Sequence, residues 1–349
     1  MTLFFVTDRA DAHVARFDEL FHTLCHDYEL VRLTYVAHGE PRASVAGLPC
    51  DSWSSLRKAL SSEDSVVVSG PLDTVSAHLA GDGFSHIGIS FATDVMVGAA
   101  KDERELARLR HAVALLGAVV TDNYATENAL IGVGADPDNI LRIPWGPDSS
   151  PEPGSMTRSE SGWPENRAIV LYPRSLEPHY NPEVFVDALS QLVPKVPNVL
   201  AVFVESGSLV SDTKERIASA GLSENSQFEP VREPEVFRRM MSLADVVVVT
   251  PRTDGTSVTV MDAMAQGIPV VSSLTAGSAE WVMDGITGWT FPVGNADALA
   301  AAIERALTAS SEHMALVTTQ AKRLVHEKAG WEPSSQRLAG LIHRLLGNH

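Results

Sequence analysis

Two carboxylates, Asp254 and Asp262, stand eight residues apart around a glycine-containing turn that follows an apolar run. The apolar spacing after the turn predicts a helix that ends at Gly267. Backbone N–H groups at Ser257 and Val258 would lie at the positive end of that helix, where they can bind an anion such as a diphosphate. Asp262 is too far along to cap the helix, and its carboxylate can accept hydrogen bonds from vicinal hydroxyl groups. The alternative is that Asp254 is only a turn residue and Asp262 a solvated helix residue.

The segments around this turn are those of an open α/β sheet. The run 244–249 does not alternate between apolar and polar residues, which is typical of a buried parallel strand. A second apolar run at 269–273 follows the helix, so the order is strand, turn, helix, strand. This order places the turn at the carboxyl ends of the strands, where open α/β sheets bind ligands.

The stretch 254–271, DGTSVTVMDAMAQGIPVV, resembles the donor-site signature of the family-4 retaining glycosyltransferases, which have the GT-B fold. That family usually carries Glu at both acidic positions. This chain carries Asp at both, which keeps the charge and shortens the reach by one methylene. The resemblance is specific over 244–307 and is weaker, but collinear, in the rest of the chain.

The resemblance implies an α/β protein of GT-B type, with two Rossmann-like domains whose parallel sheets face each other across a cleft. It also implies a C-terminal helix that crosses back to the N-terminal domain. We expect an acceptor-side domain at 1–148, a linker rich in Pro, Gly and Ser at 149–166, a nucleotide-sugar domain at 167–328 and the crossover helix at 329–349. The length of 349 residues also favours two domains, since one hydrophobic core rarely serves so long a chain.

Three residues are the catalytic candidates that the resemblance implies. Asp254 would lie beside the donor sugar, Arg174 would grip the diphosphate, and Asp94 would orient the donor or the acceptor. Arginine suits this task because its guanidinium can bind a phosphate through two parallel hydrogen bonds. Structural alternatives stay open: Arg174 could pair with Glu177 or Glu205 instead. Asp94 could simply cap the helix that follows it.

The donor-binding candidates surround the same turn and the end of one further strand. By the resemblance, Asp262 would hold the ribose, and the phosphates would meet the turn and the start of the helix. The nucleotide base would rest against the strand end near 230. The residues assigned to donor binding are Gly255, Thr256, Ser257, Val258, Asp262, Pro230 and Val231.

The chain departs from the family pattern beside the expected donor site. The family has a Lys about six residues after the arginine, and this chain lacks it. His179, Tyr180 and the helix end at Ser257 are the candidate replacements for the lost charge. The family also has a His three residues before the acid that aligns with Asp94, where this chain has Phe91.

The first loop of the chain differs from the family as well. Family members often have a glycine-rich loop there, whereas this chain has Asp8, Arg9 and His13 and no glycine. These three residues are either acceptor-specific substitutions or parts of a solvated loop.

These features together predict transfer of a sugar from a nucleotide-sugar donor to an acceptor hydroxyl, with retention and without a metal. A UDP-sugar is the favoured donor, with GDP- and ADP-sugars as alternatives, and no further cofactor is expected. The acceptor is a glycan, a glycolipid or a small molecule. Competing interpretations are a sugar epimerase or phosphorylase of the same fold, and a catalytically degenerate subunit that only binds the nucleotide sugar.

Composition restricts the partners and the compartment. The net charge of −17 and the lack of a Lys/Arg-rich run argue against nucleic acid and leave only peripheral contact with a membrane. No apolar stretch approaches the roughly 18 residues of a membrane span, and no signal peptide is recognised, so we expect a cytoplasmic location. The two cysteines and twelve histidines show no disulfide framework and no metal-ligand spacing.

Overall fold

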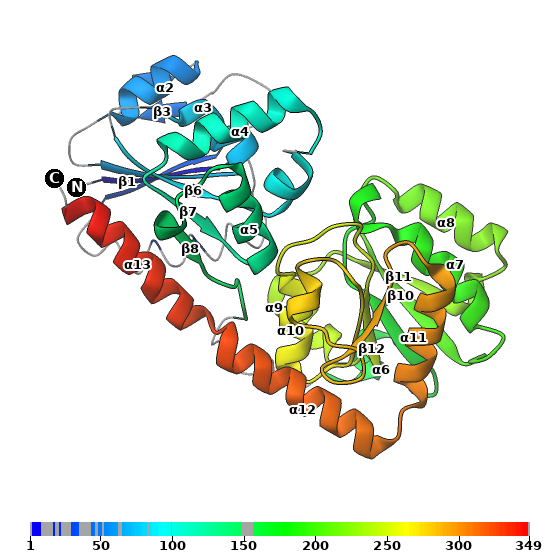
Figure 1. Ribbon diagram of the computed structural model, residues 1–349. Helices are drawn as coiled ribbons and strands as arrows, with labels where there is room; N and C mark the ends of the chain where they lie inside the picture. The colour runs from blue at the N-terminus through cyan, green and yellow to red at the C-terminus, as the bar shows by residue number, and fades with distance from the viewer. Residues whose placement is uncertain are drawn as a thin grey trace. The chain divides into compact units, whose positions relative to one another are not determined.

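The computed structural model divides the chain into two compact units. One unit is Met1–Trp145 together with Trp331–His349, and the other is Gly146–Gly330 (Figure 1). The residues that the structure describes are 2–7, 17, 21, 29–34, 43–45, 48–50, 52–61, 65–81, 84–98, 100–147 and 156–347. The first loop, with Asp8, Arg9 and His13, lies outside them.

The first unit is built on a parallel six-stranded sheet in the order β2-β1-β5-β6-β7-β8. Its strands are β1 (Thr2–Thr7), β2 (Glu29–Thr34), β5 (Ser65–Gly70), β6 (Ser85–Ile89), β7 (Ala118–Thr121) and β8 (Ile140–Arg142). Every residue of β5 and β7 is buried, because helices cover both faces of a sheet of this kind.

The helices of the first unit follow the sheet strands in sequence. They are α2 (Trp53–Leu60), α3 (Ala77–Leu79), α4 (Glu103–Leu115), α5 (Tyr124–Val133) and α13 (Trp331–Gly347), with the short segments η1 (Leu72–Ser76), η2 (Asp94–Gly98) and η3 (Pro137–Asn139). A small antiparallel hairpin of β3 (Ala43–Val45) and β4 (Leu48–Cys50) lies beside α2.

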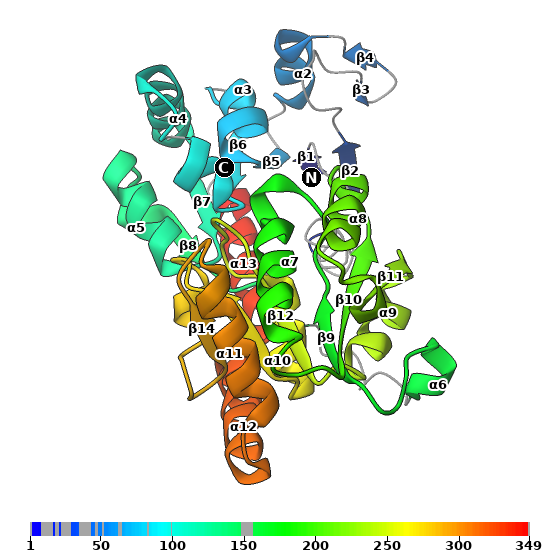
Figure 2. The same ribbon diagram turned by 90° about the vertical axis from the view of Figure 1, so that its right-hand side faces the viewer.

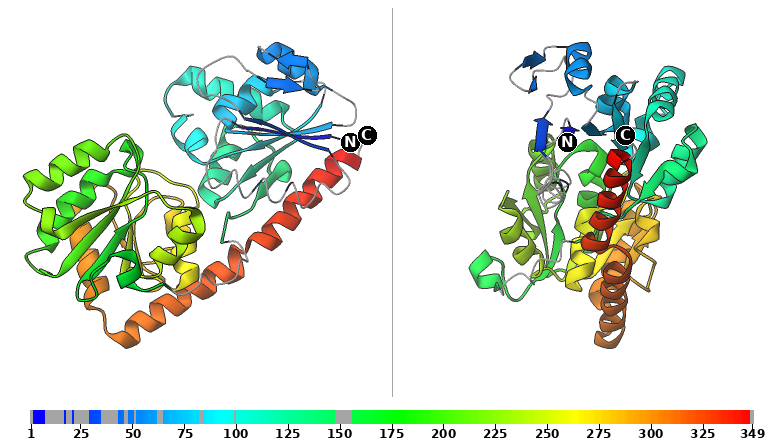
Figure 3. Two further views of the ribbon diagram at one scale, coloured as in Figure 1. Left: turned by 180° about the vertical axis from the view of Figure 1, so that it is seen from behind. Right: turned by 90° about the vertical axis from the view of Figure 1, so that its left-hand side faces the viewer.

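The terminal helix α13 belongs to the first unit, although it follows the whole of the second unit in sequence (Figure 3). Its Trp331 ring meets Phe17 edge-on, with ring centroids 5.8 Å apart. The Ser334 hydroxyl donates a hydrogen bond of 3.2 Å to the carbonyl oxygen of Pro144. The buried Leu338 and Ile342 continue this apolar stripe. The helix at the end of the chain therefore completes the core of the N-terminal unit.

One buried histidine stands out in the core of the first unit. His86 of β6 is 1% exposed, and its Nε2 lies 2.6 Å from the Ser69 hydroxyl oxygen. Burial, and to a smaller extent the positive charge of Arg57, lower the pKa of His86 to about 3. The imidazole is therefore neutral in the folded protein at ordinary pH.

The second unit has its own parallel six-stranded sheet, in the order β11-β10-β9-β12-β13-β14. Its strands are β9 (Ala168–Tyr172), β10 (Val199–Glu205), β11 (Ser226–Pro230), β12 (Val246–Val249), β13 (Val270–Ser273) and β14 (Trp289–Phe291). The order reverses between β9 and β12, which lie side by side although 73 residues separate the last residue of β9 from the first of β12. Ligands of open α/β sheets bind at such a reversal.

Helices cover both faces of this sheet. The helices α7 (Pro182–Leu192), α8 (Val210–Ser219) and α11 (Ala296–Thr308) pack on one face, and α7 and α11 lie in front of the sheet in Figure 2. The helices α9 (Pro234–Met241), α10 (Val258–Gln266) and α12 (Ser311–Lys328) pack on the other face. Shorter segments are α6 (Arg158–Ser161), η4 (Pro178–Tyr180), η5 (Ser223–Asn225) and η6 (Ser278–Glu280).

The predicted α/β class with two parallel sheets is confirmed. Helix α12 had no counterpart among the predicted elements. Its buried residues Val317, Ala321 and Val325 recur every four positions, and this stripe is too narrow to stand out beside the broader apolar face of a typical surface helix.

Candidate active site

The turn between β12 and α10 adopts the predicted geometry. Ser257 is the N-cap of α10, and its hydroxyl oxygen accepts a hydrogen bond of 3.5 Å from the Val260 amide. Gly267 ends the helix with a φ of 75°, a conformation that favours glycine. The amides of Val258 and Thr259 lie before Met261, whose N–H group is the first to bond a carbonyl within the helix, so the dipole and these N–H groups favour an anion here.

Arg174 reaches this helix end from the carboxyl end of β9. The residue is 8% exposed, and Nη1 donates a hydrogen bond of 3.2 Å to the Ser257 hydroxyl. Its Nη2 lies 3.5 Å from Oδ2 of Asp254. The structure thus brings together Arg174, Asp254 and Ser257, which the sequence analysis had assigned to one site.

The environment of Arg174 keeps it charged. Burial by itself lowers the pKa of the guanidinium. The Asp254 carboxylate, and then Tyr180 and Tyr172, more than offset burial, so the pKa of Arg174 lies above its ordinary value. A permanently charged group at the helix end is what binding of a diphosphate needs.

The alternative ion pairs of Arg174 are not formed. Glu177 instead accepts hydrogen bonds from the backbone amide and the hydroxyl of Ser208, at 2.8 and 2.5 Å. Glu205 forms an ion pair with Lys214. The acid that Arg174 meets is Asp254, and this observation corrects the structural alternative with Glu177 or Glu205.

Tyr180 stacks on Arg174, with the guanidinium carbon 3.9 Å from the ring centroid. The tyrosine lies six residues after the arginine, where the family pattern has the missing Lys. Its backbone carbonyl accepts hydrogen bonds from the Tyr172 hydroxyl at 2.8 Å and from the Thr250 hydroxyl at 2.7 Å. The backbone at Tyr180 is therefore held by β9 and by Thr250, the residue after β12, and an aromatic face lies on Arg174 where the family pattern has a cation.

Arg252 is a second cation of this loop cluster, and the sequence analysis missed it. Its backbone amide donates to the His179 carbonyl at 2.9 Å, and its Nη2 donates to Asn181 and to Glu183, at 2.8 Å each. In the sequence, Arg252 is marked only by being a charged residue between the apolar run 244–249 and Asp254. Arg252 ties the loop after β12 to the start of α7.

Gly277 was also missed. A Cβ atom at this position would lie 2.3 Å from the carbonyl oxygen of Gly255 and 2.6 Å from that of Asp254. Only a glycine lets the loop after β13 approach the acidic turn so closely. The run of small residues 276–279 after a predicted strand is the signal that could have found it.

The remaining donor-binding candidates lie at the same edge of the sheet. Gly255 and Thr256 are buried in the turn, and Asp262 is half-buried on α10. Pro230 ends β11, and the Val231 side chain that follows is 66% exposed. Because all the strands of this sheet are parallel, Pro230 and the acidic turn share the carboxyl edge of the sheet.

Asp94, the third catalytic candidate, belongs to the first unit. Its Oδ2 accepts a hydrogen bond of 2.8 Å from the Leu72 amide. Its Oδ1 accepts from the Ser90 hydroxyl at 2.8 Å and from the amides of Phe91 and Val95 at 3.1 Å. The side chain is 3% exposed. Both carboxylate oxygens hold the surrounding loop, which favours the structural alternative, and the catalytic role of Asp94 stays a prediction.

The segment before Asp94 is constrained. Phe91, which stands where the family has His, is buried and meets Trp145 edge-on at 5.2 Å. Ala92 has a φ of 64°, a strained conformation for a residue with a side chain. The backbone of this loop is therefore held in a shape that a glycine would adopt more readily.

Among the residues that the structure describes, no group of three His, Cys, Asp or Glu side chains is arranged to hold a metal ion. Within the same part of the chain, no helix has the length and apolar character needed to cross a membrane.

Comparisons with known proteins find similar sequences and similar folds. Residues 156–323, which lie within the second unit, match the family described as Glycosyl transferases group 1. The computed structure superimposes on Anabaena Alr3699/HepE in complex with UDP-glucose with a TM-score of 0.80, at 16% identity over 99% of this chain and 100% of that one. This likeness defines the GT-B fold for the chain.

Two curated relatives match parts of the chain. D-inositol 3-phosphate glycosyltransferase of Nocardia farcinica is 31% identical over 165 residues, which are 44% of this chain and 37% of that protein. A GDP-mannose-dependent alpha-(1-6)-phosphatidylinositol monomannoside mannosyltransferase of Mycolicibacterium smegmatis is 24% identical over 214 residues, 58% of this chain and 56% of that protein. The matched segments thus span less than two thirds of these relatives.

Proposed function

We propose that this protein is a glycosyltransferase of family 4 that moves a sugar from a nucleoside diphosphate sugar to an acceptor hydroxyl, with retention and without a metal. The observation that carries the proposal is the meeting of Arg174, Asp254 and Ser257 at the N-terminus of α10. A buried cation, a helix end and a carboxylate in contact suit an anion that is attached to a polyhydroxyl group.

In the proposed reaction, the bond between the anomeric carbon and the outer phosphate oxygen breaks, and the acceptor oxygen bonds to that carbon. The acceptor proton passes to the departing diphosphate. Arg174 and the first amides of α10 stabilise the negative charge that develops on the phosphate, by the logic of an oxyanion hole. Asp254 binds the sugar hydroxyls and favours the positive charge on the sugar ring. Asp262 binds the ribose.

The position of Pro230 and Val231 supports a nucleotide rather than a bare phosphate. Strand β11 is three positions away from β12 in the sheet, which is about 14 Å at ordinary strand spacing. A ligand that contacts both strand ends must be extended, as a nucleoside diphosphate is. The relatives' names mention GDP-mannose for one protein and UDP-glucose for another, so the identity of the base is part of the test.

Turnover is the decisive experiment. The protein is incubated with UDP-, GDP- and ADP-sugars and a panel of glycan, glycolipid and small-molecule acceptors, and the release of nucleoside diphosphate and the anomeric configuration of the product are measured. We expect release that depends on the acceptor, a retained configuration and unchanged rates in EDTA. Release without any acceptor-linked product, or loss of activity in EDTA, would contradict the proposal.

A further inference from the structure

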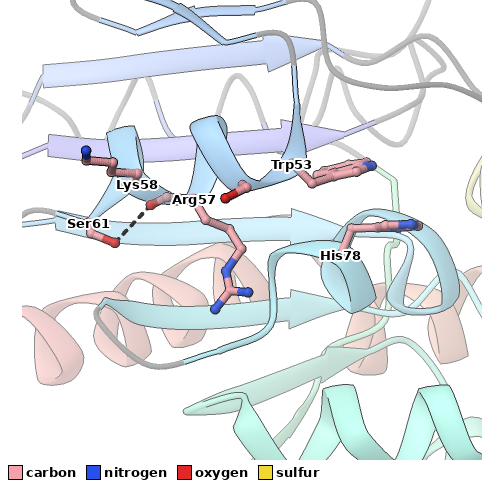
Figure 4. Close-up of a pocket in the computed structure, with 6 residues that line it drawn as sticks. Trp53, Arg57, Lys58, Ser61 and His78 are labelled. Atoms are coloured by element: carbon pink, nitrogen blue, oxygen red, sulfur yellow. Dashed lines mark hydrogen bonds between the residues drawn. The ribbon is translucent and has the colours of Figure 1, made fainter.

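The first unit contains a pocket of about 340 Å³ beside helix α2. The residues that line it belong to α2, to the C-cap of α2 and to α3. They are Trp53, Ser54, Arg57 and Lys58 of α2, the C-cap Ser61, and His78 of α3. Figure 4 shows Trp53 and His78 at one end, Lys58 and Ser61 at the other, and the Arg57 side chain extending between them. The pocket belongs to the first unit alone, so it is distinct from the site on α10.

The aromatic end of the pocket is fixed in place. The Trp53 and His78 rings stack with centroids 4.6 Å apart and an interplanar angle of 15°. Nδ1 of His78 lies 2.7 Å from the Thr74 carbonyl oxygen. Because a carbonyl can only accept, Nδ1 carries the hydrogen, and this bond sets the orientation of the ring. Ser52 caps the helix below Trp53 in a reciprocal pair with Ser55.

The two cations of the pocket form no ion pair with a carboxylate of the described residues. Arg57 is half-buried and Lys58 is exposed, in a protein with a net charge of −17. The Arg57 guanidinium occupies space that Gly81 leaves open, since a Cβ at Gly81 would lie 1.8 Å from its Nη2. The fold therefore makes room for an arginine that, within the described part of the chain, has no acid to neutralise.

We propose that this pocket binds a phosphate group of an anionic ligand. Arg57 can bind a phosphate through two parallel N–H donors, and Lys58 and Ser54, which also line the pocket, add a positive charge and a hydroxyl. Trp53 and His78 close one end of the pocket and limit the size of the group that enters. The same chemistry is offered by a free phosphate or sugar phosphate and by the headgroup of a phospholipid.

Binding is measured by NMR from the indole N–H signal of Trp53. This signal is assigned as the one that disappears from the spectrum of the Trp53→Phe variant. Inorganic phosphate and glucose 6-phosphate are titrated into the full-length protein. In a second arm, vesicles of phosphatidylcholine alone are compared in co-sedimentation with vesicles that also contain phosphatidylglycerol. The variants are Arg57→Gln/Lys58→Gln, Lys58→Gln alone, and Arg110→Gln as a control, since Arg110 is an exposed cation of α4 that does not line the pocket.

We expect saturable shifts of the Trp53 signal or binding to the anionic vesicles, weakened about tenfold or more in the double variant. Lys58→Gln should weaken binding less, and Arg110→Gln should bind as the wild type does. Response to the soluble phosphates identifies a small ligand, and response to the vesicles alone identifies a lipid headgroup. The inference is overturned if neither arm responds, or if the double variant binds like wild type. Because Lys58 is exposed, its variant remains informative even if the double variant unfolds.

Discussion

Arg174 and Asp254, 80 residues apart in sequence, approach to 3.5 Å at the N-terminus of α10. Their side chains are only 9% and 18% exposed, so the pair is largely removed from solvent. Oδ2 of Asp254 accepts no hydrogen bond, although it is buried, so the pair is held by charge alone. A diphosphate that binds Arg174 must therefore compete with Asp254 for the same guanidinium.

This competition gives the variant Asp254→Asn two effects of opposite sign. Removing the carboxylate charge should tighten the binding of a nucleoside diphosphate by about tenfold, because the phosphate no longer competes with an anion. Turnover should fall, because the carboxylate no longer favours the cationic sugar. Calorimetry with UDP and a steady-state assay measure the two effects separately. Asp187→Asn, at a surface ion pair on α7, is the matched control. Unchanged affinity and turnover would remove Asp254 from the site.

Arg174→Ala tests the phosphate clamp directly. Loss of a charged hydrogen bond should weaken nucleoside diphosphate binding by about 1.5–3 kcal/mol. The substitution also leaves the Asp254 carboxylate buried without its counter-ion, so the melting temperature should fall as well. The double variant Arg174→Ala/Asp254→Asn should regain most of that stability while staying weak in binding. An affinity equal to that of wild type in the single variant would contradict the clamp.

The ring of Tyr180 covers Arg174, and two substitutions separate this contact from the effect of the Tyr180 hydroxyl. Tyr180→Phe keeps the aromatic face and should bind UDP nearly as wild type does. Tyr180→Ala removes a cation–π contact of about 0.5–2 kcal/mol and frees the guanidinium, so the KM for the donor should rise about 2- to 30-fold. If both variants raised the KM equally, the phenol hydroxyl would be the group that supports Arg174. If neither variant changed the KM, the contact with Tyr180 would play no part in donor binding.

The buried His86 predicts acid sensitivity. Its pKa is about 3 in the folded protein against an ordinary value near 6.5, so below about pH 6.5 the unfolded chain binds a proton that the folded chain refuses. The free energy of unfolding should therefore fall by about 1.4 kcal/mol for each pH unit below 6.5, down toward pH 3. Chemical denaturation at several pH values measures this slope. His86→Gln should flatten it, whereas substitution of the exposed His111 to Gln should leave it unchanged.

Much of the site is encoded locally. The uninterrupted apolar runs predicted the buried strands on either side of the turn, and both are parallel and buried. Ser257 and Gly267 predicted the start and the end of α10, because capping depends on the conformation of neighbouring residues only. These features need no knowledge of the rest of the chain, and the family signature lies within the same short stretch.

The partners of the site residues were decided by the tertiary structure. Arg174 meets Asp254 and not Glu177 because β9 lies beside β12 in the sheet, and strand order cannot be read from the periodicity of one segment. Tyr180 stacks on Arg174, and Gly277 approaches the acidic turn, because loops that are separate in sequence lie together in the fold. Asp94 accepts hydrogen bonds at both carboxylate oxygens, in part from the backbone amide of Leu72, which is 22 residues away. Local pattern specifies which elements form, whereas long-range packing selects which side chains meet.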